Sequence, residues 1–237
     1  MVRCNDNPLW RGVSKLIAAS IEAGEYQPGD QLPPESQLAR NHGVSRFTVR
    51  QALASLEAAG VVLIEQGRGT FVRNRVIAFS LDSRTRLSAN LTMLGLPGAR
   101  RLISAETVPA DGETARTLGL APGGDCVQVR LLIEIEGRPV GLVSDHFPTP
   151  RFAGIDRVFH QTTSPTEALQ AFGVRDYRRV TTRLQSRLPS VAEARLLGMP
   201  RTHPLIVAVK QDVDPEGHLV SFGCSAFCAD RVGFVVG

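Results

Sequence analysis

The segment 43-GVSRFTVRQALASLEAAG-60 constrains the fold of this chain more than any other stretch. Its apolar residues recur at helical spacing and predict one buried side of a helix: Val49, Ala52, Leu53 and Leu56. The opposite side carries a different set: Arg46, Phe47, Arg50, Gln51 and Ala54. No acidic residue interrupts that side before Glu57, so the helix presents a basic surface that contains an apolar side chain.

This surface suits a polyanion that also displays apolar groups, as the major groove of DNA does. In such a groove Arg46 and Arg50 bind guanine edges or phosphates, and Phe47 meets thymine methyl groups. The alternative is a solvated arginine surface with Phe47 packed beneath a neighbouring hairpin. The segment by itself leaves both interpretations of Phe47 open.

The surrounding residues predict three helices followed by a hairpin. Capping residues and glycines bound the helices, at Asn7-Pro8 and Gly24, at Pro33 and Gly43, and at Ser45 and Gly60. Two strands follow, 61-VVLIE-65 and 70-TFVRN-74, joined by a glycine-rich turn with Arg68 at its tip. In this order the elements predict a winged helix-turn-helix over residues 1–75, in which Arg68 reaches a groove beside the third helix.

The run from Leu32 to Val72, with LPPESQLA, GVSRFTVRQAL, LEAAGVV and QGRGTFV, resembles the DNA-binding domain of the GntR family of bacterial repressors. In that family the start of the third helix and the tip of the wing touch DNA. The resemblance implies DNA contacts at the matching positions: Ser45, Arg46, Thr48, Arg50, Gly67 and Arg68. Ser36 departs from the pattern, because some members carry a DNA-contacting arginine there.

Residues 76–237 have a different texture and predict a second domain. Short apolar runs bounded by turn signals predict strands at 126–135, 139–147 and 204–213. Segments that begin with Ser or Asp and end at Gly predict helices at 88–95, 111–120, 164–173 and 190–198. Because strands and helices do not alternate regularly, we expect an α+β fold with a largely antiparallel sheet.

The sequence lacks the motifs of common enzymes: a Gly-rich phosphate loop, a nucleophile elbow or a zinc-hydrolase signature. Ser144, Asp145 and His146 are adjacent on a predicted strand, so they point to alternate faces and cannot form a catalytic relay. Cys224 and Cys228 have no second ligand pair, which favours buried thiols over a metal site. We therefore expect neither catalysis nor a cofactor.

One candidate anion site lies in 83-SRTRLSANL-91. Arg84 and Arg86 precede Ser88, which is expected to cap a helix, and free amides beside two guanidinium groups favour an anion. Solvated surface charge is the alternative.

A second arginine-rich segment is 178-RRVTTRLQSRL-188. Its alternation predicts a strand that carries Arg179, Thr181 and Arg183 on one face. Solvated surface charge is the favoured interpretation for three of its arginines: Arg178, Arg179 and Arg187.

Most of residues 78–236 resemble the ligand-sensing UTRA domain, a chorismate-lyase-like fold, of the HutC branch of GntR regulators. SRTRLSANL, VQVRLL, SDHFP, TTRL and ADRVGFVV are most similar to regulators of phosphonate use, the PhnF type. The resemblance implies an effector cleft between the sheet and the loop carrying Arg84 to Ser88, with further cleft positions at Arg130, Ser144, Ser164 and Arg183. Relatives that sense sugar phosphates carry a glutamate and a tyrosine where this chain has Ser221 and Phe227, which favours a small phosphonate or phosphate.

Composition sets the remaining expectations. The chain is 43% hydrophobic and 21% charged, as soluble globular proteins are, and its net charge of +4 mildly favours anionic partners. No apolar run has the roughly 20 residues that a membrane-spanning helix needs. The N-terminal residues lack the apolar block of a secretory signal, so the expected location is the cytoplasm.

Together with these patterns, the family resemblance implies a ligand-responsive DNA-binding regulator, a repressor that acts as a homodimer on an inverted-repeat operator in double-stranded DNA and binds a small anionic effector. Two alternatives stay open. One is an enzyme that acts on a small anionic substrate and carries an appended helical domain. The other is an interaction module whose Arg-Phe surface binds an acidic protein.

Overall fold

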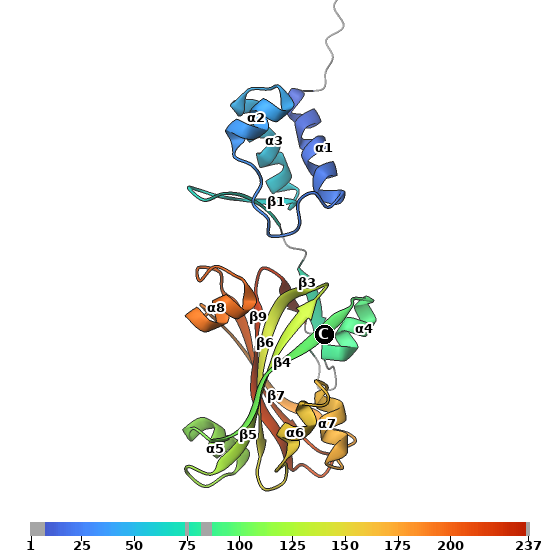
Figure 1. The fold of residues 1–237 in the computed structure, drawn as a ribbon, viewed down its shortest axis with the longest axis vertical. Helices are drawn as coiled ribbons and strands as arrows, with labels where there is room; N and C mark the ends of the chain where they lie inside the picture. Colours follow the sequence, from blue (N-terminus) through green and yellow to red (C-terminus); the bar gives the residue numbers. More distant parts are fainter. Residues whose placement is uncertain (1–7, 74–75, 82–86, 236–237) are drawn as a thin grey trace, which may run out of the picture. The chain divides into compact units, whose positions relative to one another are not determined.

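The computed structural model describes residues 8–73, 76–81 and 87–235, and for residues 87 and 88 the backbone alone. The chain forms two compact units, Met1–Arg75 and Val76–Gly237 (Figure 1). Each unit has a hydrophobic core of its own. No helix within the described residues is long and apolar enough to cross a membrane.

The first unit is a winged helix-turn-helix, as predicted. Its elements are α1 (Leu9–Glu22), α2 (Glu35–His42), α3 (Arg46–Ala58), β1 (Val62–Glu65) and β2 (Gly69–Val72). The predicted buried side of α3 lies in the core with residues of the other helices and the hairpin: Val13, Ile17, Leu38, Val49, Ala52, Leu53, Leu56, Val62 and Val72. The two strands pair antiparallel across the predicted glycine-rich turn.

The turn between α2 and α3 is short because each of its ends is capped. Gly43 ends α2 in the left-handed conformation, with φ at 63°, which glycine adopts without strain. Ser45 begins α3, where its hydroxyl accepts a hydrogen bond from the Thr48 amide at 3.1 Å. Consequently Arg46 and the following residues form the first turn of α3.

The second unit is built on a six-stranded sheet with the order β4-β5-β6-β9-β8-β7, in which every neighbouring pair is antiparallel. Its strands are β4 (Gly98–Pro109), β5 (Asp125–Ile135), β6 (Arg138–Pro148), β7 (Arg178–Arg187), β8 (Leu205–Val213) and β9 (Leu219–Cys228). A separate parallel pair joins β3 (Ile77–Ser80) to β10 (Val232–Val235). The predicted α+β class with a largely antiparallel sheet is confirmed.

Helices cover both faces of this sheet (Figure 1). The face that carries Leu131, Val143 and Asp145, called face A here, packs against β3, β10 and three helices: α4 (Leu87–Leu94), α6 (Ile155–Phe159) and α7 (Pro165–Ala171). The opposite side, face B, carries Leu132 and Leu142 and packs against α8 (Val191–Leu197), with α5 (Gly112–Leu118) on the same side. The core behind face A is rich in aromatic side chains, among them Phe79, Phe147, Phe152, Phe159 and Phe227.

Candidate nucleic-acid interface and effector cavity

The first turn of α3 presents the predicted basic surface to solvent. The side chains of Arg46 and Arg50 are 66% and 64% exposed, and Phe47 is 68% exposed. The alternative in which Phe47 packs beneath the hairpin is therefore wrong. The exposed ring of Phe47, on the same surface as two arginines, is left without an internal structural role.

Glu35, at the start of α2, holds the two arginines of this surface. Arg50 donates from Nε and Nη2 to the two carboxylate oxygens of Glu35, at 3.1 and 2.9 Å, and Arg46 Nη2 lies 3.9 Å from Glu35 Oε2. The hydrogen bond from Arg50 lowers the pKa of Glu35 despite its partial burial, and the same bond raises the pKa of Arg50. The guanidinium group of Arg50 is thereby oriented before any partner is bound.

The tip of the hairpin is fixed by hydrogen bonds and by glycine geometry. Gln31 Nε2 donates to the carbonyl oxygen of Arg68 at 2.7 Å, and a side chain at Gly69 would overlap that same amide. Gly67 and Gly69 have φ values of 77° and 124°, which favour glycine. Arg68 pairs with Glu65, and its guanidinium carbon lies 5.7 Å from the centre of the Phe71 ring.

The structure thus places all seven predicted DNA-binding residues on two features of one unit. Five lie at the start of α3: Ser45, Arg46, Phe47, Thr48 and Arg50. The other two, Gly67 and Arg68, lie at the turn of the hairpin. Ser45 also caps the helix, and its hydroxyl oxygen lies 2.9 Å from the hydroxyl oxygen of Thr48.

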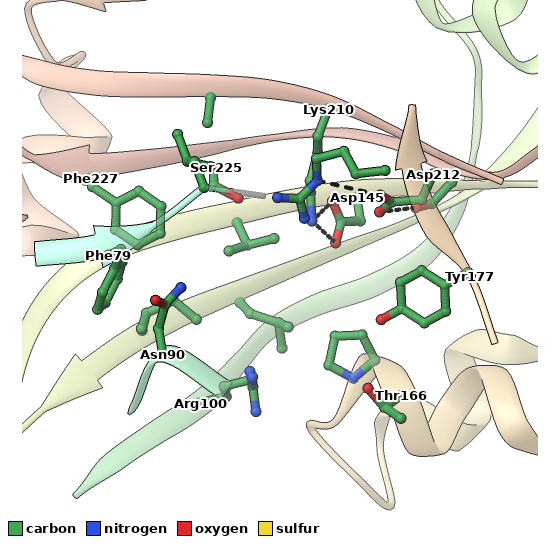
Figure 2. A pocket seen from close by; sticks show the side chains of 18 of the residues that line it. Phe79, Asn90, Arg100, Asp145, Thr166, Tyr177, Lys210, Asp212, Ser225 and Phe227 are labelled. Carbon is green, nitrogen blue, oxygen red and sulfur yellow. Dashed lines mark hydrogen bonds and ion pairs between the residues drawn. The ribbon is translucent and has the colours of Figure 1, made fainter. Parts of the chain in front are cut away.

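The second unit contains a cavity of about 110 Å³ over face A (Figure 2). Side chains from the middle of the sheet line its floor, and β3, β10, α4 and α7 supply the remaining walls. Apolar lining comes from Phe79, Leu131, Ile133, Val143, Phe147, Leu169, Phe227 and Phe234. Charged lining comes from Arg100, Asp145, Arg179, Lys210 and Asp212.

Lys210 and Asp145 form an ion pair on the cavity floor. The Lys210 ammonium lies 3.0 and 3.1 Å from the two Asp145 oxygens. Burial alone lowers the pKa of Lys210, but attraction from Asp145 and Asp212 outweighs burial and raises it. Lys210 is therefore protonated, and the pair is neutral as a whole.

Asp212 is less well compensated than Asp145. Its Oδ1 lies 3.4 Å from Arg179 Nε, and its Oδ2 accepts a hydrogen bond from the Ser221 hydroxyl at 3.4 Å. Within the described residues neither Asp212 Oδ1 nor Arg179 Nε has a partner in hydrogen-bonding geometry. A buried carboxylate with two long contacts is under-satisfied.

Arg100 enters the same cavity from β4 (Figure 2). No described residue forms a hydrogen bond or an ion pair with its guanidinium group. Burial lowers the pKa of Arg100, and only Tyr177 and Glu167 oppose that shift, by attraction through space. A guanidinium group stays protonated even so, and Arg100 therefore supplies a partly buried positive charge that has no bonded counter-ion among the described residues.

Three residues predicted to face the effector lie on the other side of the sheet. Arg130 pairs with Ser144, Ser144 with Cys224, Cys224 with Val209 and Val209 with Arg183, so all these side chains share one row across face B. Asp145 and Lys210 are their sequence neighbours on face A. Arg130, Ser144 and Arg183 therefore share face B, outside this cavity, and three strands separate Arg130 on β5 from Arg183 on β7.

The remaining predictions for the effector site have mixed outcomes. Ser164 caps α7, where its hydroxyl accepts from the Glu167 amide at 3.3 Å, and its neighbours Pro165 and Thr166 line the cavity instead. Arg84 and Arg86 lie outside the described residues. Ser88 lies in α4, where the structure does not describe its side chain.

Two positions implied by the family resemblance, Ser221 and Phe227, do line the cavity. Arg179 does so as well, and its side chain is only 18% exposed, so the prediction of a solvated Arg179 is wrong. Sequence reasoning missed Arg100, Lys210 and Asp212. The one available signal was the charged pair at i and i+2, Lys210 and Asp212, at the end of an otherwise apolar strand.

The arrangement is suited to binding rather than to catalysis. Asp145 is paired with Lys210 on face A, whereas His146 lies on face B, where its Nε2 is 2.9 Å from the Gln128 amide nitrogen. No cluster of three or more potential metal ligands occurs among the described side chains. Cys228 is buried and Cys224 partly buried in β9, and burial raises the pKa of both thiols, that of Cys228 to about 11.

Comparison with protein families matches both units. The model of bacterial regulatory proteins of the gntR family matches residues 9–72, and the UTRA domain model matches residues 95–232. An HTH-type transcriptional regulator of Rhizobium meliloti is 34% identical over 225 residues, which cover 94% of this chain and 92% of the relative. The transcriptional repressor NagR of Bacillus subtilis is 27% identical over 96% of this chain and 93% of its own length.

The transcriptional repressor PhnF of Mycolicibacterium smegmatis is 29% identical over 87% of this chain and 83% of its own length. A crystal structure of PhnF from Mycobacterium smegmatis matches with a TM-score of 0.65 at 26% identity, over 95% of this chain and 98% of that one. With a basic first turn on α3 and a cavity with charged lining in the second unit, the chain belongs to the GntR family, HutC branch, as a DNA-binding transcriptional regulator with a ligand-binding UTRA domain, and not as an enzyme.

Proposed function

We propose that this chain is a homodimeric repressor whose operator is an inverted repeat and whose effector is a small phosphonate or phosphate-type anion. In this proposal it controls genes of phosphonate uptake or metabolism. DNA is contacted by the seven residues at the start of α3 and at the turn of the hairpin. The effector occupies the cavity over face A.

The exposed surface formed by Arg46, Phe47 and Arg50 carries the DNA part of the proposal. Hydrogen bonds from arginine to guanine edges discriminate among bases, and an apolar ring can contact a thymine methyl group. Arg68 lies at a tip that Gln31 and two glycines fix in one conformation, which suits a contact in the adjacent groove.

Repression and an anionic effector have support from two sources. Relatives over most of the chain include the transcriptional repressors NagR and PhnF. Among the described lining residues of the cavity, three cations outnumber two carboxylates, so the site has an excess of one positive charge. That excess favours a negatively charged ligand.

A dimer is supported by the surface of β7, which is an edge strand of the sheet. Val180, Leu184 and Leu188 on or beside this strand are 41%, 44% and 60% exposed. Exposed apolar side chains along an unpaired edge favour association with another chain. A two-fold dimer in turn requires two-fold related half-sites in the operator.

Selection of bound duplexes from a random DNA pool tests the proposal, with and without a panel of phosphonates and phosphates. We expect an inverted repeat whose binding responds to a member of the panel. Arg46→Ala or Arg50→Ala should weaken the selected site by about 10–100-fold and relax one base position, whereas Arg195→Ala on exposed α8 should not. Unchanged operator affinity in both recognition variants would overturn the DNA part of the proposal.

A further inference from the structure

We propose that the effector carries an ammonium group as well as its anionic head, so that it is a short aminoalkyl phosphonate or the matching phosphate ester. This inference rests on the proposed function, because it assigns the effector of the same cavity. The inference follows from a difference between the two ends of the cavity. One end holds the guanidinium group of Arg100, and the other holds the carboxylates of Asp145 and Asp212.

The anionic head is assigned to Arg100. Its guanidinium group is drawn into the cavity, and none of the described side chains bonds to it. A partly buried cation that no described side chain pairs is costly, and an anion that accepts bidentate hydrogen bonds from the guanidinium group reduces that cost. Asn90, which lies near Arg100 in Figure 2, is already engaged with both backbone polar groups of Ser80, at 2.8 and 3.1 Å.

The ammonium group is assigned to the carboxylate end. Asp212 Oδ1 is buried, and within the described part of the chain it has no partner in hydrogen-bonding geometry, whereas both Asp145 oxygens lie within 3.1 Å of the Lys210 ammonium. The cation nearest to Asp212 Oδ1 in the described residues is Arg179, whose Nε lies 3.4 Å away. A charged donor on the ligand provides the shorter and stronger bond that Asp212 lacks.

Strand register separates the two ends. Arg100 pairs with Ile133 on β5, whereas Asp145 pairs with Val129, four residues further along that strand. The backbones at the two ends are therefore roughly 13 Å apart along the strand direction. The row between them on face A is largely apolar, with Leu131, Val143 and Ala208 beside Ser225. A ligand that reaches both ends has polar termini and a short hydrocarbon middle.

The volume of the cavity and the charge of its lining narrow the class of effector. At about 10–15 Å³ for each water-sized group, a cavity of 110 Å³ holds roughly seven to eleven non-hydrogen atoms. That volume is sufficient for an aminoethyl phosphonate. A doubly charged head with one ammonium group has a net charge of −1, which balances the single excess positive charge of the described lining residues.

Calorimetric titration of the full-length chain tests this inference with four probes: 2-aminoethylphosphonate, O-phosphoethanolamine, ethylphosphonate and ethylamine. We expect both amino compounds to bind at least tenfold more tightly than ethylphosphonate, and ethylamine not to bind. The ranking of the first two probes distinguishes a phosphonate from a phosphate ester. The wild-type series is decisive without any variant, so a misfolded mutant cannot obscure it.

Variants locate the two ends of the ligand. Arg100→Gln should abolish binding of the amino compounds, with Arg101→Gln as the matched control on the opposite, exposed side of β4. Asp212→Asn should reduce the affinity for 2-aminoethylphosphonate to the affinity that the wild-type chain has for ethylphosphonate. Asp214→Asn is its control, because Asp214 is buried and paired with Arg151 at 2.7 Å but does not line the cavity.

Equal binding of ethylphosphonate and 2-aminoethylphosphonate would overturn the inference and leave the proposed phosphonate effector standing. If no phosphorus-containing probe binds to a chain that still recognises its operator, both the inference and the proposed effector class are wrong. Loss of operator recognition in the selection experiment is a separate failure, which concerns only the DNA-binding unit.

Discussion

Glu35 pairs with the two arginines that we propose to contact DNA, and its removal should change how the chain discriminates among DNA sequences. In Glu35→Gln, Arg46 and Arg50 lose their internal counter-ion and are available to any phosphate. We expect affinity for non-operator DNA to rise and the salt slope of that binding to steepen by about one unit. The ratio of operator to non-operator affinity should fall.

Fluorescence titrations of operator and scrambled duplexes over a salt series measure this effect. Glu22→Gln is the matched control, because it removes the same charge from an exposed position of α1. The lowered pKa keeps Glu35 ionised at neutral pH, so the difference should persist from about pH 6 to about pH 8. An equal effect of both variants would show that net charge alone is responsible.

Gly223 lies where a side chain would obstruct the cavity floor. A methyl group on Gly223 would overlap the Asp145 carboxylate and the carbonyl oxygen of Ser144. Gly223→Ala should therefore displace Asp145 from Lys210, destabilise the second unit by about 1–3 kcal/mol and remove effector binding. Gly112→Ala, at an open position of α5, should be neutral or slightly stabilising. Urea unfolding followed by circular dichroism compares the two, and equal stabilities would contradict the packing described.

The start of α8 is a pH-sensitive element. Arg187 donates two hydrogen bonds to Glu193, at 2.8 and 2.6 Å, and Glu193 forms a capping box with Ser190. The bonds from Arg187 are the main cause that lowers the pKa of Glu193 to about 2. Because the folded pKa is below the unfolded value, this contribution is complete above about pH 4.5 and is lost as the pH falls towards about 2.

Glu193→Gln should therefore cost about 1 kcal/mol at neutral pH, less than the pKa shift suggests, because Arg187 is partly exposed and solvent screens the pair. The deficit should shrink as unfolding is measured at progressively lower pH. Glu113→Gln, in the first turn of α5, removes an acidic residue without a capping box and should show a smaller change. If the loss of stability in Glu193→Gln did not depend on pH, the lost contact would not be ionic.

Elements with capping residues could be predicted from the sequence, whereas the face of a strand residue could not. Helix limits at Gly43, Ser45 and Gly198 follow from local backbone chemistry. Arg179 was assigned to the same face as Thr181 because strands alternate. In the structure a register shift between Arg179 and Thr181 places Arg179 opposite Asp212 and Thr181 opposite Gln211, so the two side chains lie on different faces.

The cavity itself could not be derived from local patterns. Arg100 lies on β4, a strand that was not predicted. It lines the same cavity as residues of β7 and β8 because strands that are distant in sequence pair in one sheet. By contrast, α3 and the hairpin lie within 30 residues of each other, and their functional residues were predicted together. The DNA-binding unit is local in sequence, and the effector site is not.

At the scale of the whole molecule, the proposed regulator must obey reciprocity between its two ligands. If the effector changes operator affinity by some factor, the operator must change effector affinity by that same factor. Calorimetry of 2-aminoethylphosphonate binding, with and without saturating operator duplex, supplies one factor, and operator titration with and without the effector supplies the other. Unequal factors would show that the two molecules do not act on one conformational equilibrium.

The irregularity in β7 also affects how related sequences should be aligned. Arg179 and Val180 together occupy the place opposite Asp212 that a regular strand fills with one residue. A relative with a regular strand is therefore one residue shorter between Arg178 and Thr181, and an alignment without a gap at Val180 matches cavity residues with residues of the other face. Along this edge, the number of residues decides which side chain faces the cavity.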